Sequence, residues 1–115
     1  MKKIEAIIRK TKFEEVKEAL HDNGIEFFSF WDARGVGMAR QSRVYRGVAY
    51  DTSTIERIYL SIVVRDINLD LTIKTIVDAA KSGEVGDGKI FVSNIDQSVR
   101  IRTGEEGDDS LYIKD

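Results

Sequence analysis

The sequence predicts an α+β fold in which two helices cover one face of an antiparallel sheet. Three observations support this prediction. Segments 3–8 and 55–64 alternate apolar with polar residues, as half-buried strands do. Segments 13–20 and 69–80 instead place their apolar residues on one helical face. With two further strands, the elements follow the order strand, helix, strand, strand, helix, strand, which is typical of a ferredoxin-like βαββαβ sandwich.

In the first half of the chain, the strand at 3–8 precedes residues 11–14, TKFE, which match a capping box. The capping box predicts the start of the first helix, and Asn23-Gly24 predicts its end. The aromatic-rich segment 25–36 is predicted as the second strand, and 55–64 as the third.

In the second half, a helix is predicted over 69–80, with Asn68 as its N-cap and Gly83 as its stop. Residues 89–92 and 97–102 are predicted as two short strands, the second being an extra strand beyond the six-element order. The acidic C-terminal end is expected to be mobile.

Length and composition indicate one domain over 1–115. The chain has no cysteine and one histidine, His21, which excludes disulfides and argues against a structural metal. A net charge of −2 gives no overall attraction for nucleic acid or anionic lipid. No apolar run reaches the ~20 residues of a membrane span, and the start does not resemble a signal peptide. We therefore expect a cytoplasmic protein without direct membrane insertion.

The sheet face away from the helices is predicted to carry Ile7, Tyr59 and Val63. This set is too apolar to face water without a reason. Two interpretations remain open: a few exposed apolar residues, or a symmetric oligomer built sheet against sheet.

A glycine-rich stretch at 83–89, GEVGDGK, matches the letters of a P-loop. Its context does not, because a P-loop follows a strand, opens a helix and has Ser or Thr after the lysine. Here the stretch follows a helix, opens a strand and continues with Ile90. A P-loop is therefore excluded.

The same stretch still has the features of an anion site. Gly86 and Gly88 permit backbone N–H groups to form an anion nest, and Lys89 adds a positive charge. Arg100 and Arg102, two apart on a predicted strand, point the same way and add donors for a polyphosphate. The alternatives are a nucleotide site and a plain glycine turn with solvated arginines.

Two other functions are considered. Residues 89–94, KIFVSN, resemble the shorter sheet motif of RNA-recognition domains, but the longer partner motif is missing. A small phosphate-handling enzyme would need a positioned base, and His21 lies at a predicted helix end that suits dipole stabilisation better. We therefore expect no nucleic-acid partner and no enzymatic turnover.

Four stretches taken together resemble the PII nitrogen-regulatory family: MKKIEAIIR at 1–9, YRGVAY at 45–50, SGEVGDGKIFV at 82–92 and IRTGE at 101–105. The resemblance implies a homotrimer of ferredoxin-like subunits with inward-facing sheets. It also implies ATP and ADP sites between subunits, with Mg²⁺ accompanying ATP.

The resemblance further implies a T-loop at about 38–54, a B-loop at about 81–89 and a C-terminal loop at about 100–115. Ser61 departs from the family pattern, where glutamate is common, and puts one adenine contact in doubt. The implied nucleotide residues are Ser29, Gly35, Gly37, Met38, Val63, Gly86, Asp87, Gly88, Lys89, Arg100, Ile101 and Arg102.

The T-loop is longer than compact domains tolerate without a function, and in the family it docks on partner proteins. Arg46 matches the loop-tip arginine of members that bind an ammonium transporter, which implies recruitment to the membrane's inner face. Nitrogen-assimilation enzymes, such as glutamine synthetase or its modifying enzyme, are the alternative partners. Tyr50 matches the tyrosine that some bacteria uridylylate, although Tyr45 and Tyr50 could instead pack the loop against its base.

The 2-oxoglutarate site of the family is incomplete here. Ala39 stands where the family commonly has a glutamine that helps to hold Mg²⁺ and 2-oxoglutarate, and Arg57 replaces a lysine. Gln41 can substitute only if the loop rearranges. Weak or absent 2-oxoglutarate binding is expected.

Overall fold

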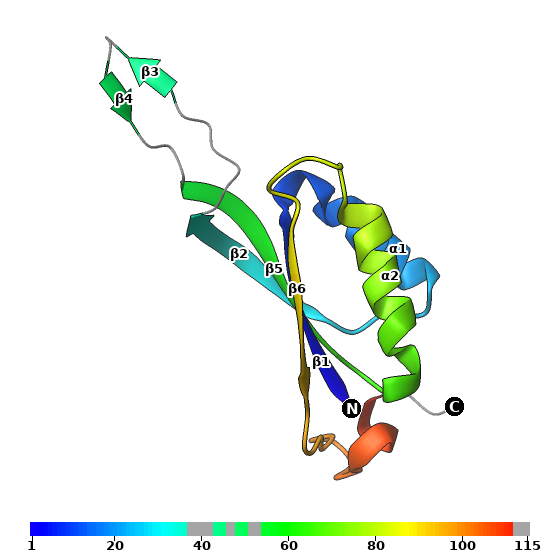
Figure 1. Cartoon of the computed structure of the whole chain (residues 1–115). Coiled ribbons are helices and arrows are strands. Elements are labelled where there is room, and N and C mark those ends of the chain that lie inside the picture. The colour runs from blue at the N-terminus through cyan, green and yellow to red at the C-terminus, as the bar shows by residue number, and fades with distance from the viewer. Residues whose placement is uncertain (37–42, 46–47, 51–53, 112–115) are drawn as a thin grey trace.

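The computed structural model describes residues 1–36 and 54–111, together with the backbone of two short strands at 43–45 and 48–50. Four strands form one antiparallel sheet in the order β2-β5-β1-β6. The two helices lie on the same face of this sheet (Figure 1). The predicted ferredoxin-like βαββαβ order is confirmed. The elements are β1 (Lys2–Arg9), α1 (Phe13–Asp22), β2 (Ser29–Val36), β5 (Thr54–Val64), α2 (Leu69–Ala80) and β6 (Gly88–Asn94), with β3 (Arg43–Tyr45) and β4 (Val48–Tyr50) paired in a separate two-stranded sheet.

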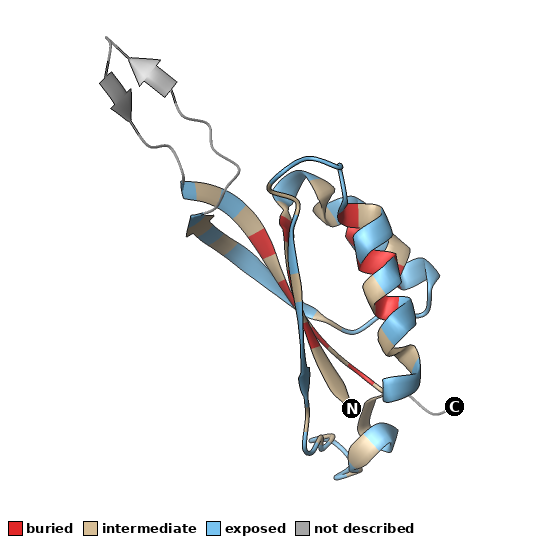
Figure 2. Cartoon of the chain, viewed as in Figure 1, coloured by how far each residue is buried: buried red, intermediate tan, exposed pale blue. Residues whose placement is uncertain are grey.

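The core lies between the sheet and the helices. Alternate residues of β1 and β5 are buried, and both helices bury one face against them (Figure 2). The alternation in the sequence therefore predicts correctly which side chains of β1 and β5 are buried. The buried hydrophobic residues are Ile4, Ala6, Ile8, Val16, Leu20, Ile58, Leu60, Ile62, Val64, Ile76 and Ala80.

Neither helix has the predicted side-chain cap at its start, although α2 begins at Leu69 as predicted. The capping box at 11–14 is wrong, because a 3₁₀ turn, η1 (Lys10–Lys12), leads into α1 and Lys12 occupies the cap without a side-chain bond. The N–H of Phe13 instead bonds to the carbonyl of Lys10. Asn68 does occupy the N-cap of α2, after η2 (Asp66–Asn68), but its side chain makes no capping bond.

The ends of these segments are also corrected in part. Gly24, with φ 78°, follows α1 as predicted. Gly83 is not the immediate stop of α2, because Lys81 already has extended backbone. The second strand begins at Ser29 rather than at residue 25, since the N–H of Ile25 bonds to Leu20 and stays with the helix.

The extra strand predicted at 97–102 is wrong. The chain turns back at Gly104, whose N–H donates to the carbonyl of Arg100 at 2.7 Å, and Val99 forms an isolated bridge with Glu106. Within the acidic end, a 3₁₀ helix forms, η3 (Gly107–Leu111). The mobility of this end stays a prediction, whereas the missing strand is explained by contacts within the C-terminal segment.

The open face of the sheet carries the predicted Ile7, Tyr59 and Val63, each partly exposed. It also carries Trp31, which stacks on Tyr59 with ring centroids 4.7 Å apart, and Phe91, which is 52% exposed. Two large aromatic side chains thus add to the apolar surface that the sequence predicts. No element of the described chain covers this face.

Candidate functional site

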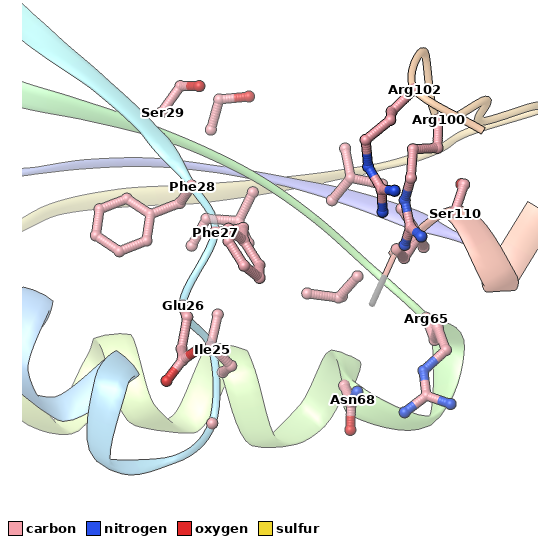
Figure 3. A pocket seen from close by; sticks show the side chains of 16 residues that line it. Ile25, Glu26, Phe27, Phe28, Ser29, Arg65, Asn68, Arg100, Arg102 and Ser110 are labelled. Atoms are coloured by element: carbon pink, nitrogen blue, oxygen red, sulfur yellow. The ribbon is translucent and has the colours of Figure 1, made fainter. Parts of the chain in front are cut away.

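A pocket of about 960 Å³ opens between segment 24–29, the end of β5 and the segment after β6. Predicted residues from three separate parts of the chain line it together: Ser29, Val63, Arg100 and Arg102. Aromatic side chains, Phe27 and Phe28, also belong to its lining (Figure 3). Cationic, hydroxyl and aromatic groups in one pocket suit an anionic ligand with a planar ring.

The two arginines converge although the strand predicted to align them is absent. Figure 3 shows both guanidinium groups directed into the pocket. Arg100 is fixed by an ion pair to Glu105, with Nη1 to Oε1 at 3.0 Å, and donates from Nη2 to the carbonyl of Asp109 at 3.2 Å. Ile101, between them, is fully exposed and does not line the pocket. The predicted role of Ile101 stays a prediction.

The glycine loop joins α2 to β6 at the other end of the sheet. Gly86 and Gly88 have φ values of 100° and 106°, in the left-handed region that favours glycine. Lys89 is exposed and pairs with Ile7 on the open face of the sheet. The predicted turn geometry is therefore present.

The carboxylate of Asp87 is turned into the loop rather than outward. It accepts hydrogen bonds from Ser82 and Gly83 and forms an ion pair with Arg9 at 3.0 Å. Hydrogen bonds from Ser82, and then from Arg9, hold the pKa of Asp87 well below its usual range. Because folding lowers this pKa, the ionised carboxylate contributes stability above about pH 3.9, and that contribution is lost as the pH falls through the lowered pKa.

Two arginines of the sheet reach this loop. Arg9 donates from Nη2 to the carbonyl of Val85 at 2.9 Å, and Arg57 donates from Nη2 to the carbonyl of Gly86 at 3.1 Å. Burial, and then the charge of Arg9, lowers the pKa of Arg57. Arg9 and Ser82 are contacts of this loop that the residue pattern alone did not predict. The pairing of Ile8 with Gly88 brings Arg9, the next residue of β1, beside the loop. This pairing is known only once the register of β1 and β6 is known.

The predicted residues thus fall into two groups within one chain. Lys89 lies at the start of β6, whereas Arg100 and Arg102 follow its last residue, Asn94. At about 3.3 Å per residue, the strand from Lys89 to Asn94 spans roughly 17 Å. One phosphate chain cannot contact both groups of a single subunit.

Several predicted residues lie outside the described part of the chain. These are Gly37, Met38 and Arg46, together with Ala39 and Gln41. Tyr50 is the last residue of β4, where its backbone pairs with Arg43, but its side chain is not described. Gly35 is described, and it pairs with Ile55 near the end of β2.

Comparison with known proteins identifies the family. A family model described as "Nitrogen regulatory protein P-II" matches residues 1–105. The chain belongs to the PII family. Similar proteins of this printed name occur in Rhodobacter capsulatus (44% identical), Rhizobium meliloti (43%) and Microchaete diplosiphon (44%), and each match covers 96% of this chain and 100% of the relative.

Membership of the family indicates the general function: PII proteins are nitrogen-regulatory signal transducers that act through partner proteins. None of the described helices is long and apolar enough to cross a membrane. Within the described residues, no group of three His, Cys, Asp or Glu side chains could hold a metal ion.

Proposed function

We propose that this PII protein is a homotrimer that binds ATP and ADP between subunits and regulates an ammonium transporter through segment 38–54. The observation that carries the nucleotide proposal is the separation of the two basic groups along β6. Each group is half of a polyphosphate site. A neighbouring subunit that placed its Arg100 and Arg102 beside Lys89 would complete the site.

The open sheet face supports assembly. Trp31, Tyr59 and Phe91 leave apolar surface on a face that the helices do not cover. Packing of this face against copies of itself removes that surface from water. A trimer with inward-facing sheets would cover the open face and would also bring the two basic groups of neighbouring subunits together.

A regulator also fits the described chemistry better than an enzyme. Arg100, Arg102 and Lys89 are cationic residue types, which suit the binding of an anion. The single histidine, His21, lies beside Glu26 at the end of α1, and it is not among the residues that line the pocket of Arg100 and Arg102. We accordingly expect nucleotide binding without turnover.

Replacing Lys89 by alanine is expected to weaken binding of ATP and ADP by about 1.5–3 kcal/mol, because one charge-assisted contact to phosphate is lost. Calorimetric titration measures this effect. Lys81→Ala is the matched control, since Lys81 is an exposed lysine before the same loop. Equal affinities of the Lys89 variant and the wild-type protein would refute the assignment.

Replacing Arg46 by alanine is expected to abolish co-purification with membranes that contain the ammonium transporter. In sequence, Arg46 falls between Tyr45 and Val48, the last pair of the β3–β4 sheet. An arginine forms several directional hydrogen bonds that alanine cannot replace. Arg43→Ala, in strand β3 three residues earlier in the sequence, is the control.

A complex that survives Arg46→Ala would reject the transporter role of this residue. Retention of the variant by immobilised glutamine synthetase, or by its modifying enzyme, would instead favour the alternative partners. Light scattering on the variant checks that its assembly is unchanged.

A further inference from the structure

Asp87 has four hydrogen-bond donors around its carboxylate. Oδ1 accepts from Nε of Arg9 at 3.0 Å and from the hydroxyl of Ser82. Oδ2 accepts from the N–H of Ser82 at 2.8 Å and from the N–H of Gly83 at 2.9 Å. The side chain is 24% exposed. Both oxygens are engaged within the subunit, so the carboxylate closes the first half of the loop.

The second half of the loop is held by its carbonyls. Arg9 binds the carbonyl of Val85 and Arg57 binds that of Gly86. In a planar trans peptide the C=O and the following N–H point in opposite directions. The N–H groups of Gly86 and Asp87 therefore point away from the two arginines. Successive N–H groups directed to one side form an anion nest.

We propose that Asp87 is a positioning residue: its carboxylate, together with Arg9 and Arg57, shapes loop 82–88 so that backbone N–H groups meet a phosphate that the carboxylate itself never touches. The proposal rests on the proposed nucleotide function. It divides the loop into two parts. The N–H groups of Ser82 and Gly83 donate to Asp87. The N–H groups that follow Val85 are left to donate to the ligand.

Asp87→Asn tests the proposal because two explanations predict opposite signs. If Asp87 acted only through its charge, its removal would strengthen polyphosphate binding, since like charges repel. If Asp87 positions the loop, the variant binds more weakly, because an amide NH₂ cannot accept from the N–H groups of Ser82 and Gly83. We expect the affinity for ATP and for ADP to fall about tenfold or more.

Glu84→Gln is the matched control. Glu84 is an exposed carboxylate of the same loop, and its side chain has no hydrogen bond or ion pair within the described residues. The charge change is identical, so nucleotide affinity should stay the same or rise. Ser82→Ala removes one of the four donors and should weaken binding less than Asp87→Asn. This milder variant keeps the test decisive if Asp87→Asn folds poorly.

A double-mutant cycle with Lys89→Ala separates positioning from general destabilisation. If Asp87 acts by presenting the loop to phosphate, its effect shrinks once Lys89 is absent, because both changes disrupt the same contact region. A purely structural role gives additive effects. Additive effects, or an Asp87→Asn variant that binds ATP as tightly as wild type, would overturn the proposal.

Hydrogen exchange provides a readout that does not depend on nucleotide. In the ligand-free protein the amides of Ser82 and Gly83 should be protected, and Asp87→Asn should remove that protection, whereas Glu84→Gln should not. Failure of the wild-type protein to bind ATP or ADP would sink the proposed function while leaving this exchange result informative. Unprotected amides in the wild type would sink the positioning role itself.

Discussion

Replacing Gly88 by alanine is expected to destabilise the fold by about 3 kcal/mol or more and to abolish nucleotide binding. A Cβ atom at this position would lie 1.7 Å from the carbonyl oxygen of Ile7 and 2.8 Å from its carbon. Both are backbone atoms of the paired strand β1, so no side-chain rotation relieves the clash. The start of β6 must move away from β1, and Lys89 moves with it.

Urea unfolding measures the change in stability, and Gly24→Ala is its control. Gly24 has a comparable φ of 78°, but no heavy atom lies within 4 Å of its added Cβ. Gly24→Ala therefore carries only the backbone cost of the left-handed region, about 1–2 kcal/mol. Equal destabilisation by the two variants would show that the close approach to Ile7 is not the cause.

The second large effect concerns 2-oxoglutarate, which we expect to bind weakly or not at all even with Mg·ATP present. A dicarboxylate held through Mg²⁺ requires hard oxygen ligands around the metal, of which ATP supplies only part. Ala39 offers no side-chain oxygen. Bringing Gln41 to the metal would fix additional backbone at about 1–2 kcal/mol per residue. The protein should therefore respond mainly to ATP versus ADP.

Titration of the Mg·ATP-loaded protein with 2-oxoglutarate tests this expectation, and Ala39→Gln is the informative variant. If the missing amide oxygen is the reason, the substitution should create saturable binding. Micromolar binding by the wild-type protein would show the prediction wrong. If neither protein binds 2-oxoglutarate, the missing amide oxygen is not the sole cause. Arg57, which stands where the family commonly has a lysine and donates to the carbonyl of Gly86, is then the next residue to test.

The sequence was most informative where local pattern and burial agree. Alternation in β1 and β5 identified the buried residues, such as Ile4 and Leu60, because a strand with one covered face can hide only every second side chain. The glycine spacing likewise identified the turn at Gly86 and Gly88, since few other residues adopt its backbone.

The sequence was least informative where particular hydrogen bonds, local or distant, override the residue pattern. The residues at 97–102 read as a strand, but Gly104 and Glu105 fold the segment back on Arg100. A 3₁₀ turn stands where the capping box was predicted, and in it the N–H of Phe13 bonds to the carbonyl of Lys10. Arg9 is far from Asp87 in sequence, so their ion pair could not be predicted without the register of β1 and β6.

A divided nucleotide site has a consequence for mixed assemblies. If each site takes Lys89 from one subunit and Arg100 and Arg102 from its neighbour, Lys89→Ala and the double variant Arg100→Ala/Arg102→Ala each lose every site. In a mixed trimer one interface regains both intact halves. Co-expression with two different tags allows such trimers to be isolated.

The decisive measurement is therefore calorimetric titration of the purified mixed trimer with ATP. Light scattering should first give a mass near three times the 13.0 kDa of one chain. We predict one site per mixed trimer with wild-type affinity, while each parent variant binds weakly. Mixed trimers that bind no better than either parent, or a mass equal to that of a single chain, would contradict a site shared between subunits.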